Sequence, residues 1–260
     1  PFMAVLYVVL AVIIMVTNIT AIPAAIVTIV KSAFTGSALA GGAMGSMIVA
    51  MQKGIARGIF SNESGLGSAP IAAAAAQTKE PVRQGLVSMT GTFIDTIVIC
   101  TMTGLSIVIT GTWNTGLEGV EITTAAFQKG LPFPPVVASF ALMICLVFFA
   151  FTTLLGNCFY CDNLLIYIHK KQPGKAFMKG FRLVSALAIF LGAGMEMSLL
   201  WDLSDVLMGV MALINIPVIL ILSGIAVKAI QDYEVQLKQG INPVFKSADI
   251  GLSQKTDFWS

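Results

Sequence analysis

Long apolar runs, separated by short polar segments, dominate the chain from its first residue to about residue 228. A helix that crosses the hydrocarbon layer of a membrane needs about 20 mostly apolar residues. By that criterion the pattern predicts about six spans, at residues 1–22, 41–76, 84–109, 135–168, 181–200 and 206–228. The runs lack the period-two alternation of outer-membrane barrel strands. We therefore expect an all-α, polytopic membrane helical bundle.

Composition supports a lipid environment. Of the 260 residues, 57% are hydrophobic and only 11% are charged, whereas a soluble domain carries about 25% charge. The expected organisation is a transmembrane domain at 1–228, with an interfacial helix near residues 24–34, followed by a polar tail at 229–260. The first apolar run begins at Pro1 without a preceding polar loop, so we expect the chain to be a fragment that lacks an N-terminal half.

Loop charge predicts the orientation, because Lys and Arg accumulate on the cytoplasmic side of a membrane protein. The loop between the fourth and fifth spans, HKKQPGKAFMKGFR, contains five Lys and Arg residues and no acid: Lys170, Lys171, Lys175, Lys179 and Arg182. This loop and the C-terminal tail are therefore expected in the cytoplasm, and the protein in the inner membrane as a multi-pass protein.

A cluster of polar residues interrupts the second predicted span. Its members are Arg57, Ser61, Asn62, Glu63, Ser64 and Ser68, with glycines at 58, 65 and 67 and a proline at 70. Polar groups at membrane depth are costly and are kept where they pair or line a water-filled path. We expect the helix to break at about residues 61–67 and to restart with Ser68 as its N-cap and Pro70 in the first turn.

A break in a membrane helix exposes backbone groups that can bind a carboxylate, an ammonium group or Na⁺. Close packing of small residues is an alternative that explains the glycines near residues 41–45. It does not explain an Arg, an Asn and a Glu within seven residues. A structural ion pair between Arg57 and Glu63 and a direct ligand role for Glu63 both stay open.

Two polar residues elsewhere also fall inside predicted spans. Asp95 could pair with Lys53 or Arg57 or lie in the coupling path, and the pair is favoured because an unpaired charge at that depth is costly. Asn215 precedes Pro217 by two residues and is expected to satisfy backbone groups that the proline frees.

The run RGIFSNESGLGSAP, continued by IAAAAAQTKEPVRQGLVSMTGTFIDTIVICTMTGL, resembles the signature region of the alanine or glycine:cation symporters, the sodium:alanine symporter family. The resemblance implies a LeuT-type fold of two inverted five-helix repeats, with substrate and sodium bound at the broken first and sixth core helices. On that template the first span here is similar to core helix five, and the other five spans form the second repeat. A complete site would then need the N-terminal half.

The resemblance also suggests roles for particular residues. Ser61 and Asn62 match the unwound stretch that contacts the substrate's α-amino or carboxylate group, with Glu63 beside them, and Gly65 and Gly67 match the glycines that permit the break. In the run FAFTTLLGN, Thr152 and Thr153 are candidate sodium ligands, since hydroxyl oxygens are hard donors. Their alternative is a hydrogen bond to the carbonyl of their own helix.

Asn157 stands where the family often has a tryptophan one turn below those threonines. An amide in place of a bulky ring would enlarge the pocket, so a substrate more polar than alanine, such as glutamine, stays open. Asn157 is therefore a candidate substrate-binding residue.

The expected function is sodium-coupled symport of a small neutral amino acid, alanine or glycine with glutamine open, by alternating access. Na⁺ is the coupling ion, and no other cofactor is expected. An ion channel or a structural membrane subunit is the alternative. An enzyme is not expected, because the sequence offers no nucleophile and base pair, phosphate loop or metal-ligand cluster; the Cys158–Cys161 pair has no second ligand pair nearby. A nucleic-acid partner is not expected either, since there is no basic stripe.

Overall fold

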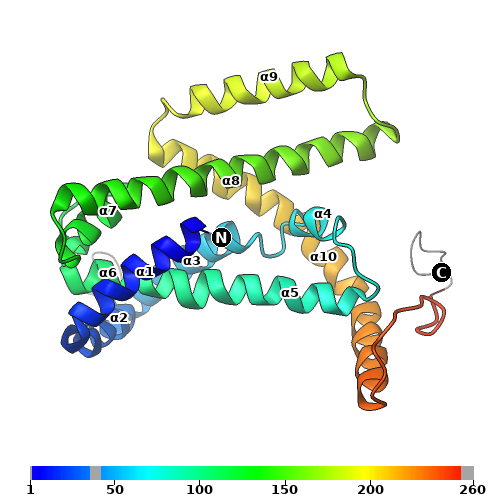
Figure 1. Cartoon of the computed structure of the whole chain (residues 1–260), viewed down its shortest axis with the longest axis horizontal. Coiled ribbons are helices and arrows are strands. Elements are labelled where there is room, and N and C mark those ends of the chain that lie inside the picture. Colours follow the sequence, from blue (N-terminus) through cyan, green and yellow to red (C-terminus); the bar gives the residue numbers. More distant parts are fainter. Residues whose placement is uncertain (1, 36–41, 253–260) are drawn as a thin grey trace. The chain divides into compact units, whose positions relative to one another are not determined.

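The computed structural model describes residues 2–35 and 42–252 (Figure 1). The regular structure in these residues is helical and contains no strand. The helices are α1 (Phe2–Thr17), α2 (Ile22–Thr35), α3 (Gly42–Asn62), α4 (Ala69–Ala73), α5 (Pro81–Phe93), α6 (Thr101–Thr110), α7 (Gly119–Gly130), α8 (Pro135–His169), α9 (Lys175–Gly192) and α10 (Met197–Lys238). Two short 3₁₀ helices, η1 (Ile19–Ala21) and η3 (Thr112–Asn114), and a π-helix, η2 (Ile94–Cys100), complete the set.

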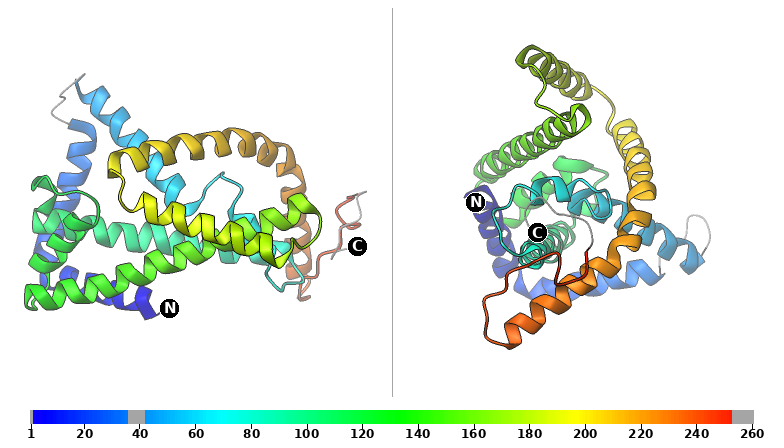
Figure 2. Two further views of the ribbon diagram at one scale, coloured as in Figure 1. Left: turned by 90° about the horizontal axis from the view of Figure 1, so that it is seen from above. Right: turned by 90° about the vertical axis from the view of Figure 1, so that its right-hand side faces the viewer.

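Within the described residues, three helical stretches are long and apolar enough to cross a membrane: Pro81–Thr110, Pro135–His169 and Met197–Lys238. A fourth forms if α1 and the helix that follows it count as one broken span, bent by 77° (Figure 2). The protein is thus a helical membrane protein. The predicted spans at 84–109, 135–168 and 206–228 fall inside these stretches. The predicted second span at 41–76 is not confirmed, because α3, which contains most of its first part, is not among the helices that meet the criterion; Gly41 itself lies outside the described residues.

The fifth predicted span, 181–200, is wrong in its bounds. Helix α9 ends at Gly192, and α10 begins at Met197. The intervening residues include Gly194, and two glycines so close together favour the end of a helix. The three cations of α9, Lys175, Lys179 and Arg182, also lie within a single helix of 18 residues.

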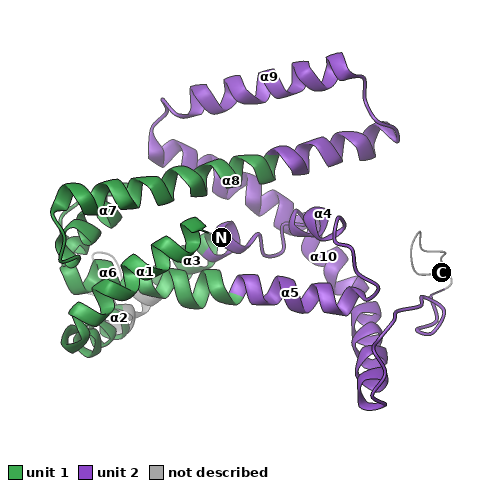
Figure 3. Cartoon of the chain, viewed as in Figure 1, with its two compact units in different colours: residues 1–57, 93–157 green, residues 58–92, 158–260 purple. Residues whose placement is uncertain are grey.

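The chain forms two compact units (Figure 3): residues 1–57 with 93–157, and residues 58–92 with 158–260. We refer to them as unit 1 and unit 2. The boundaries between the units fall inside three helices: in α3 after residue 57, in α5 after residue 92 and in α8 after residue 157.

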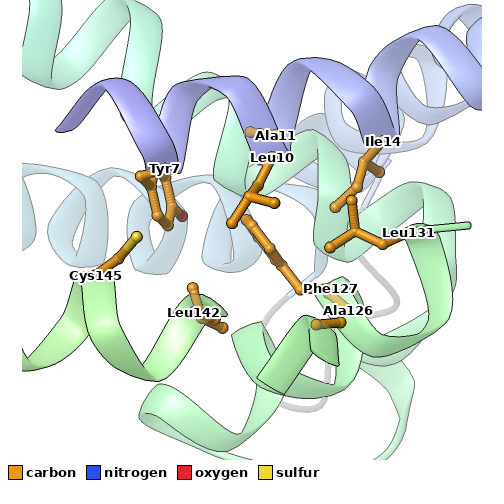
Figure 4. Close-up of a cluster of buried hydrophobic side chains, with 10 residues drawn as sticks. Tyr7, Leu10, Ala11, Ile14, Ala126, Phe127, Leu131, Leu142 and Cys145 are labelled. Atoms are coloured by element: carbon orange, nitrogen blue, oxygen red, sulfur yellow. The ribbon is translucent and has the colours of Figure 1, made fainter. Parts of the chain in front are cut away.

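The core of unit 1 is built on one face of α1 (Figure 4). Tyr7, Leu10, Ala11 and Ile14 are buried, at the i, i+3, i+4, i+7 spacing that places apolar side chains on one face of a helix. They pack with Ala126 and Phe127 of α7, with Leu131, and with Ala138, Leu142 and Cys145 of α8. The Tyr7 ring lies 5.4 Å from that of Phe127 and 5.8 Å from that of Phe149, in the second case edge to face. This cluster fixes α1, α7 and the first half of α8 together.

Unit 2 contains a helical hairpin made by the end of α8 and by α9. An ion pair joins Asp162 of α8 to Arg182 of α9. Nearer the turn, the rings of His169 and Phe177 lie 5.3 Å apart. His169 is thus part of the hairpin's own packing, in addition to lying at the start of the basic loop.

A second feature of unit 2 is the segment after α10, residues 241–252, which folds back onto the start of α5. We call it the C-terminal segment. The Phe245 N–H donates a hydrogen bond of 3.2 Å to the Lys79 carbonyl, and Arg83 Nη2 donates one of 2.8 Å to Asn242 Oδ1. Phe245 and Ile250 are buried with Ala229 of α10. The tail predicted from residue 229 onward therefore begins as helix and then packs on unit 2.

Beside this segment, Glu80 is fully buried. The Val82 N–H donates to Glu80 Oε1 at 3.1 Å, while Oε2 is buried without a hydrogen-bond partner. Burial raises the pKa of the Glu80 carboxyl above its ordinary range, and Asp232 on α10 adds to the rise, while the Val82 N–H and Arg83 oppose it. Glu80 is thus a titratable group enclosed where α5, α10 and the C-terminal segment meet.

Candidate functional site

The candidate site is the interruption between α3 and α4, in unit 2. Helix α3 ends at Asn62 and α4 begins at Ala69. Three residues of the interruption have positive φ: Glu63 at 52°, Gly65 at 78° and Gly67 at 84°. Positive φ is costly for residues other than glycine, so the two glycines explain locally why the helix stops here. The range 61–67 expected from the sequence overlaps this interruption.

The Glu63 carboxylate bridges the two ends of the interruption. Ser68 Oγ, directly before α4, donates a hydrogen bond of 2.6 Å to Glu63 Oε2. The Tyr160 hydroxyl of α8 donates to Oε1 over 3.3 Å. Hydrogen bonds to a carboxylate are about twice as strong as neutral ones, and the Ser68 bond is the shorter of the two. The hydrogen bonds of the Glu63 side chain therefore stabilise the left-handed backbone conformation of this residue.

Ser68 occupies the N-cap position of α4, with Pro70 in the first turn, but its side chain makes no capping hydrogen bond. The capping role expected of Ser68 is wrong. Its backbone is in the αR region, at φ −81° and ψ −42°, whereas a capping residue usually has extended dihedrals that aim its oxygen at the next turn. Its hydroxyl bonds Glu63 instead.

Asn215 of α10 makes the second side-chain contact to the interruption. Its Nδ2 donates a hydrogen bond of 2.9 Å to the Gly65 carbonyl. The sequence suggested that Asn215 serves the backbone next to Pro217; the structure instead assigns its amide to a residue 150 positions away. Near the start of α10, the rings of Trp201 and Phe60 lie 5.1 Å apart. Helix α10 thus contacts the end of α3 and the interruption itself.

The residues expected to contact a substrate lie at the end of α3. Ser61 is exposed and Asn62 is half-buried. Asn62 Nδ2 donates a hydrogen bond of 3.2 Å to the Gly58 carbonyl one turn earlier. Both residues remain helical, so the unwound stretch starts one residue after them. Glu63 and Gly65 are the candidate site residues that lie within it.

Thr152 and Thr153 belong to unit 1, in the middle of α8. The Thr152 hydroxyl donates to the Phe148 and Phe149 carbonyls at 3.0 Å each, and the Thr153 hydroxyl donates to Phe149 at 2.9 Å. Both threonines thus make the hydrogen bonds to their own helix that the sequence offered as the alternative to a sodium role. A hydroxyl that donates its hydrogen still keeps acceptor lone pairs, so the bonds are compatible with a cation ligand.

Asn157 is exposed, one turn after the threonines. Asp95 lies in the π-helix η2, which the sequence did not predict. Such single π turns are rare and are frequent at functional sites, and no residue pattern in IDTIVIC announces one. In the part of the chain that the structure describes, no three His, Cys, Asp or Glu residues gather as a metal site.

A cavity of about 1000 Å³ lies beside α4. Its lining includes small residues of α4 and of the loop after it, residues at the start of α5, and Val244 and Phe245 of the C-terminal segment. Helix α4 is therefore not packed tightly on all sides within unit 2.

A family model for the sodium:alanine symporter family matches residues 1–247. The chain belongs to this family. Among curated relatives, it is 47% identical over 240 residues to an uncharacterized transporter of Haemophilus influenzae, covering 92% of this chain and 51% of that protein. It is 43% identical over 231 residues to the sodium/alanine symporter AgcS of Methanococcus maripaludis, covering 87% and 49%.

A third relative is the probable sodium/glutamine symporter GlnT of Bacillus subtilis, 38% identical over 247 residues, with 94% of this chain and 49% of that protein covered. The chain spans about half the length of the curated relatives it matches. Membership confirms the resemblance drawn from the SNESG region and places the chain in a family of transporters rather than enzymes.

Proposed function

We propose that this chain is one half of a sodium-coupled symporter that carries a small neutral amino acid across the inner membrane by alternating access. The other half corresponds to the part of the relatives' length that this chain does not span. The single observation that carries the proposal is the interruption at Glu63–Ser68, which is held open by side chains of α8 and α10.

An interrupted helix supports this function because it supplies polar backbone groups where the membrane otherwise offers none. Helix α3 has 21 residues, and the carbonyls at its C-terminal end carry the negative end of the helix dipole. That end favours an ammonium group or Na⁺. Ser61, Asn62 and Glu63 stand at this end and are the proposed contacts of the substrate's α-amino or carboxylate group.

The names of the relatives support the proposed substrate class. Relatives are named for alanine and for glutamine, both neutral amino acids. Asn157 offers an amide to a polar side chain. Alanine, glycine and glutamine are the proposed candidates.

The sodium site is proposed at Thr152 and Thr153. Their hydroxyls donate within α8 and keep oxygen lone pairs for a cation. No cofactor other than Na⁺ as the coupling ion is proposed for transport.

The architecture proposed for the complete transporter is a LeuT-type inverted repeat, in which this chain supplies the second repeat and one helix of the first. The proposed orientation has the Lys- and Arg-rich segment 170–182 and the C-terminus in the cytoplasm, because Lys and Arg accumulate on that side of a membrane protein.

The test is uptake of radiolabelled alanine, glycine and glutamine by vesicles that contain the complete transporter, with Na⁺ or K⁺ outside. Asn62→Ala is compared with Asn163→Ala, a matched control, because Asn163 is also half-buried and its amide bonds the Phe159 carbonyl of its own helix. Sodium-dependent uptake that is lost in Asn62→Ala and kept in Asn163→Ala supports the proposal. Equal uptake in both variants contradicts the site, and ion conductance without amino-acid uptake favours a channel.

A further inference from the structure

Asn215 is a residue of α10 whose side chain reaches the interruption, where Ile216 also lies close to Gly65. Its Nδ2 lies 2.9 Å from the Gly65 carbonyl oxygen. Gly65 follows the end of α3, so its carbonyl lies outside the regular hydrogen-bonding pattern of a helix. A carbonyl in that position needs a donor from elsewhere, since an unpaired buried backbone group is costly.

The same side chain also packs against Gly67. A Cβ atom built on Gly67 would lie 3.0 Å from Asn215 Oδ1 and 3.1 Å from its Cγ. That separation is shorter than ordinary van der Waals contact between carbon atoms, which is about 3.5–4.0 Å. Gly67 is therefore glycine for two reasons: its φ of 84° and the amide of Asn215 above it. One side chain thus contacts both glycines of the interruption.

We propose that Asn215 is a positioning residue for transport: its amide holds the Gly65–Gly67 backbone in the unwound conformation that binds the substrate and couples that segment to α10. This proposal rests on the proposed function and adds to it a residue that acts through the backbone of the site. Asn215 need not touch the amino acid. It fixes the direction in which the carbonyl and N–H groups of residues 65–67 point.

A positioning role has a specific signature in transport kinetics. Loss of the amide lets the unwound segment adopt more conformations. Only a fraction of the protein molecules then has the conformation that binds the substrate. Apparent affinity then falls while the amount of folded protein in the membrane is unchanged. For the loss of one hydrogen bond to a backbone group, we expect Asn215→Ala to raise KM roughly 5- to 30-fold.

The experiment is sodium-dependent uptake by the complete transporter in vesicles, with KM and the maximal rate measured separately. Asn215→Ala is compared with Asn163→Ala, and Asn215→Gln tests whether an amide on a longer side chain restores part of the affinity. The proposal is supported if KM rises in Asn215→Ala, falls back in Asn215→Gln and is unchanged in Asn163→Ala. A wild-type KM in Asn215→Ala overturns it.

A double-variant cycle tests the contact itself. Gly67→Ala adds both backbone strain and a clash with Asn215, whereas in an Asn215→Ala background only the strain remains. The contact predicts that the double variant lowers the melting temperature, measured in detergent, by less than the sum of the two single effects. Additive effects overturn the contact.

The melting-temperature cycle does not depend on transport. If the wild-type protein takes up no amino acid with sodium, the proposed function fails, while a non-additive cycle still supports the Asn215 contact. If uptake is sodium-dependent and the cycle is additive, the proposed function stands and the positioning role fails.

Discussion

The Ser68 hydroxyl donates a hydrogen bond of 2.6 Å to the Glu63 carboxylate, which joins the start of α4 to the residue that follows the end of α3. Glu63 has a positive φ, which costs a non-glycine residue roughly 1–2 kcal/mol. A hydrogen bond to a charged group contributes a similar amount, about 1.5–3 kcal/mol. The side-chain bond therefore offsets the backbone strain at the same residue.

Substitution of either partner should weaken the interruption. We expect Ser68→Ala to raise the KM for sodium-dependent uptake roughly tenfold, the fold-change that corresponds to 1.4 kcal/mol, because Glu63 loses its shorter hydrogen bond. Ser64→Ala is the control, since Ser64 is an exposed serine in the same segment. Equal KM values for the two variants would show that the bond does not position the site.

The Tyr160 bond to Glu63 should matter less. At 3.3 Å it is longer than the usual 2.5–3.0 Å for two oxygen atoms. We expect Tyr160→Phe to change KM by less than about threefold, smaller than the effect of a typical neutral hydrogen bond, when assayed beside Ser68→Ala. A larger effect for Tyr160→Phe than for Ser68→Ala would reverse the assigned order of the two bonds.

Phe245 anchors the C-terminal segment. It is 6% exposed and packs with Ala229 and Ile250. We expect Phe245→Ala to cost about 3 kcal/mol of local stability, at the low end for a buried phenylalanine. The check is limited proteolysis of residues 241–252 in membranes, where Phe245→Ala should be cut faster. Val244→Ala is the control, because Val244 is 42% exposed, and equal cleavage of both variants would contradict the anchor.

Packing of the C-terminal segment should depend on pH through Glu80. Burial holds the pKa of its carboxyl above the ordinary value of 4.5, so the packed state binds the proton more tightly than the unpacked state. The stabilising contribution of the protonated carboxyl is then present below the ordinary pKa and is lost as pH rises through the raised pKa. Asp232 faces Glu80 from α10 and Arg83 from α5.

Hydrogen exchange in residues 241–252, measured at a series of pH values and corrected for the intrinsic pH dependence of exchange, reports this loss. Protection should fall as pH rises in the wild type, and Glu80→Gln should flatten the dependence because glutamine does not titrate. The same slope in both proteins would assign the pH effect to another group.

Local sequence patterns predicted several elements of this fold. The lengths of the apolar runs indicated the spans at 84–109, 135–168 and 206–228, and the glycines at 65 and 67 indicated where α3 stops, because both signals lie within a few residues of the feature they predict. The end of α9 at Gly192 was missed because the apolar run from 181 to 200 contains no proline and outweighed the local signal of Gly192 and Gly194.

Contacts between distant segments could not be predicted. Asn215 and Gly65 are 150 positions apart, and a polar residue near Pro217 offered a local explanation that the fold did not use. Ser68 has the residue type of a cap, but its backbone lies in the αR region and its hydroxyl bonds Glu63, five positions earlier. The sequence thus indicated which residues are unusual but not which partners they have.

If sodium drives an amino acid through the site at the interruption, a sodium gradient must concentrate that amino acid. The most direct measurement is accumulation of radiolabelled alanine, glycine or glutamine inside vesicles that contain the complete transporter, after a sodium gradient is imposed and then collapsed with a sodium ionophore. We expect at least one of these amino acids to rise above its outside concentration and to fall back when the gradient collapses. Equal inside and outside concentrations throughout would contradict it.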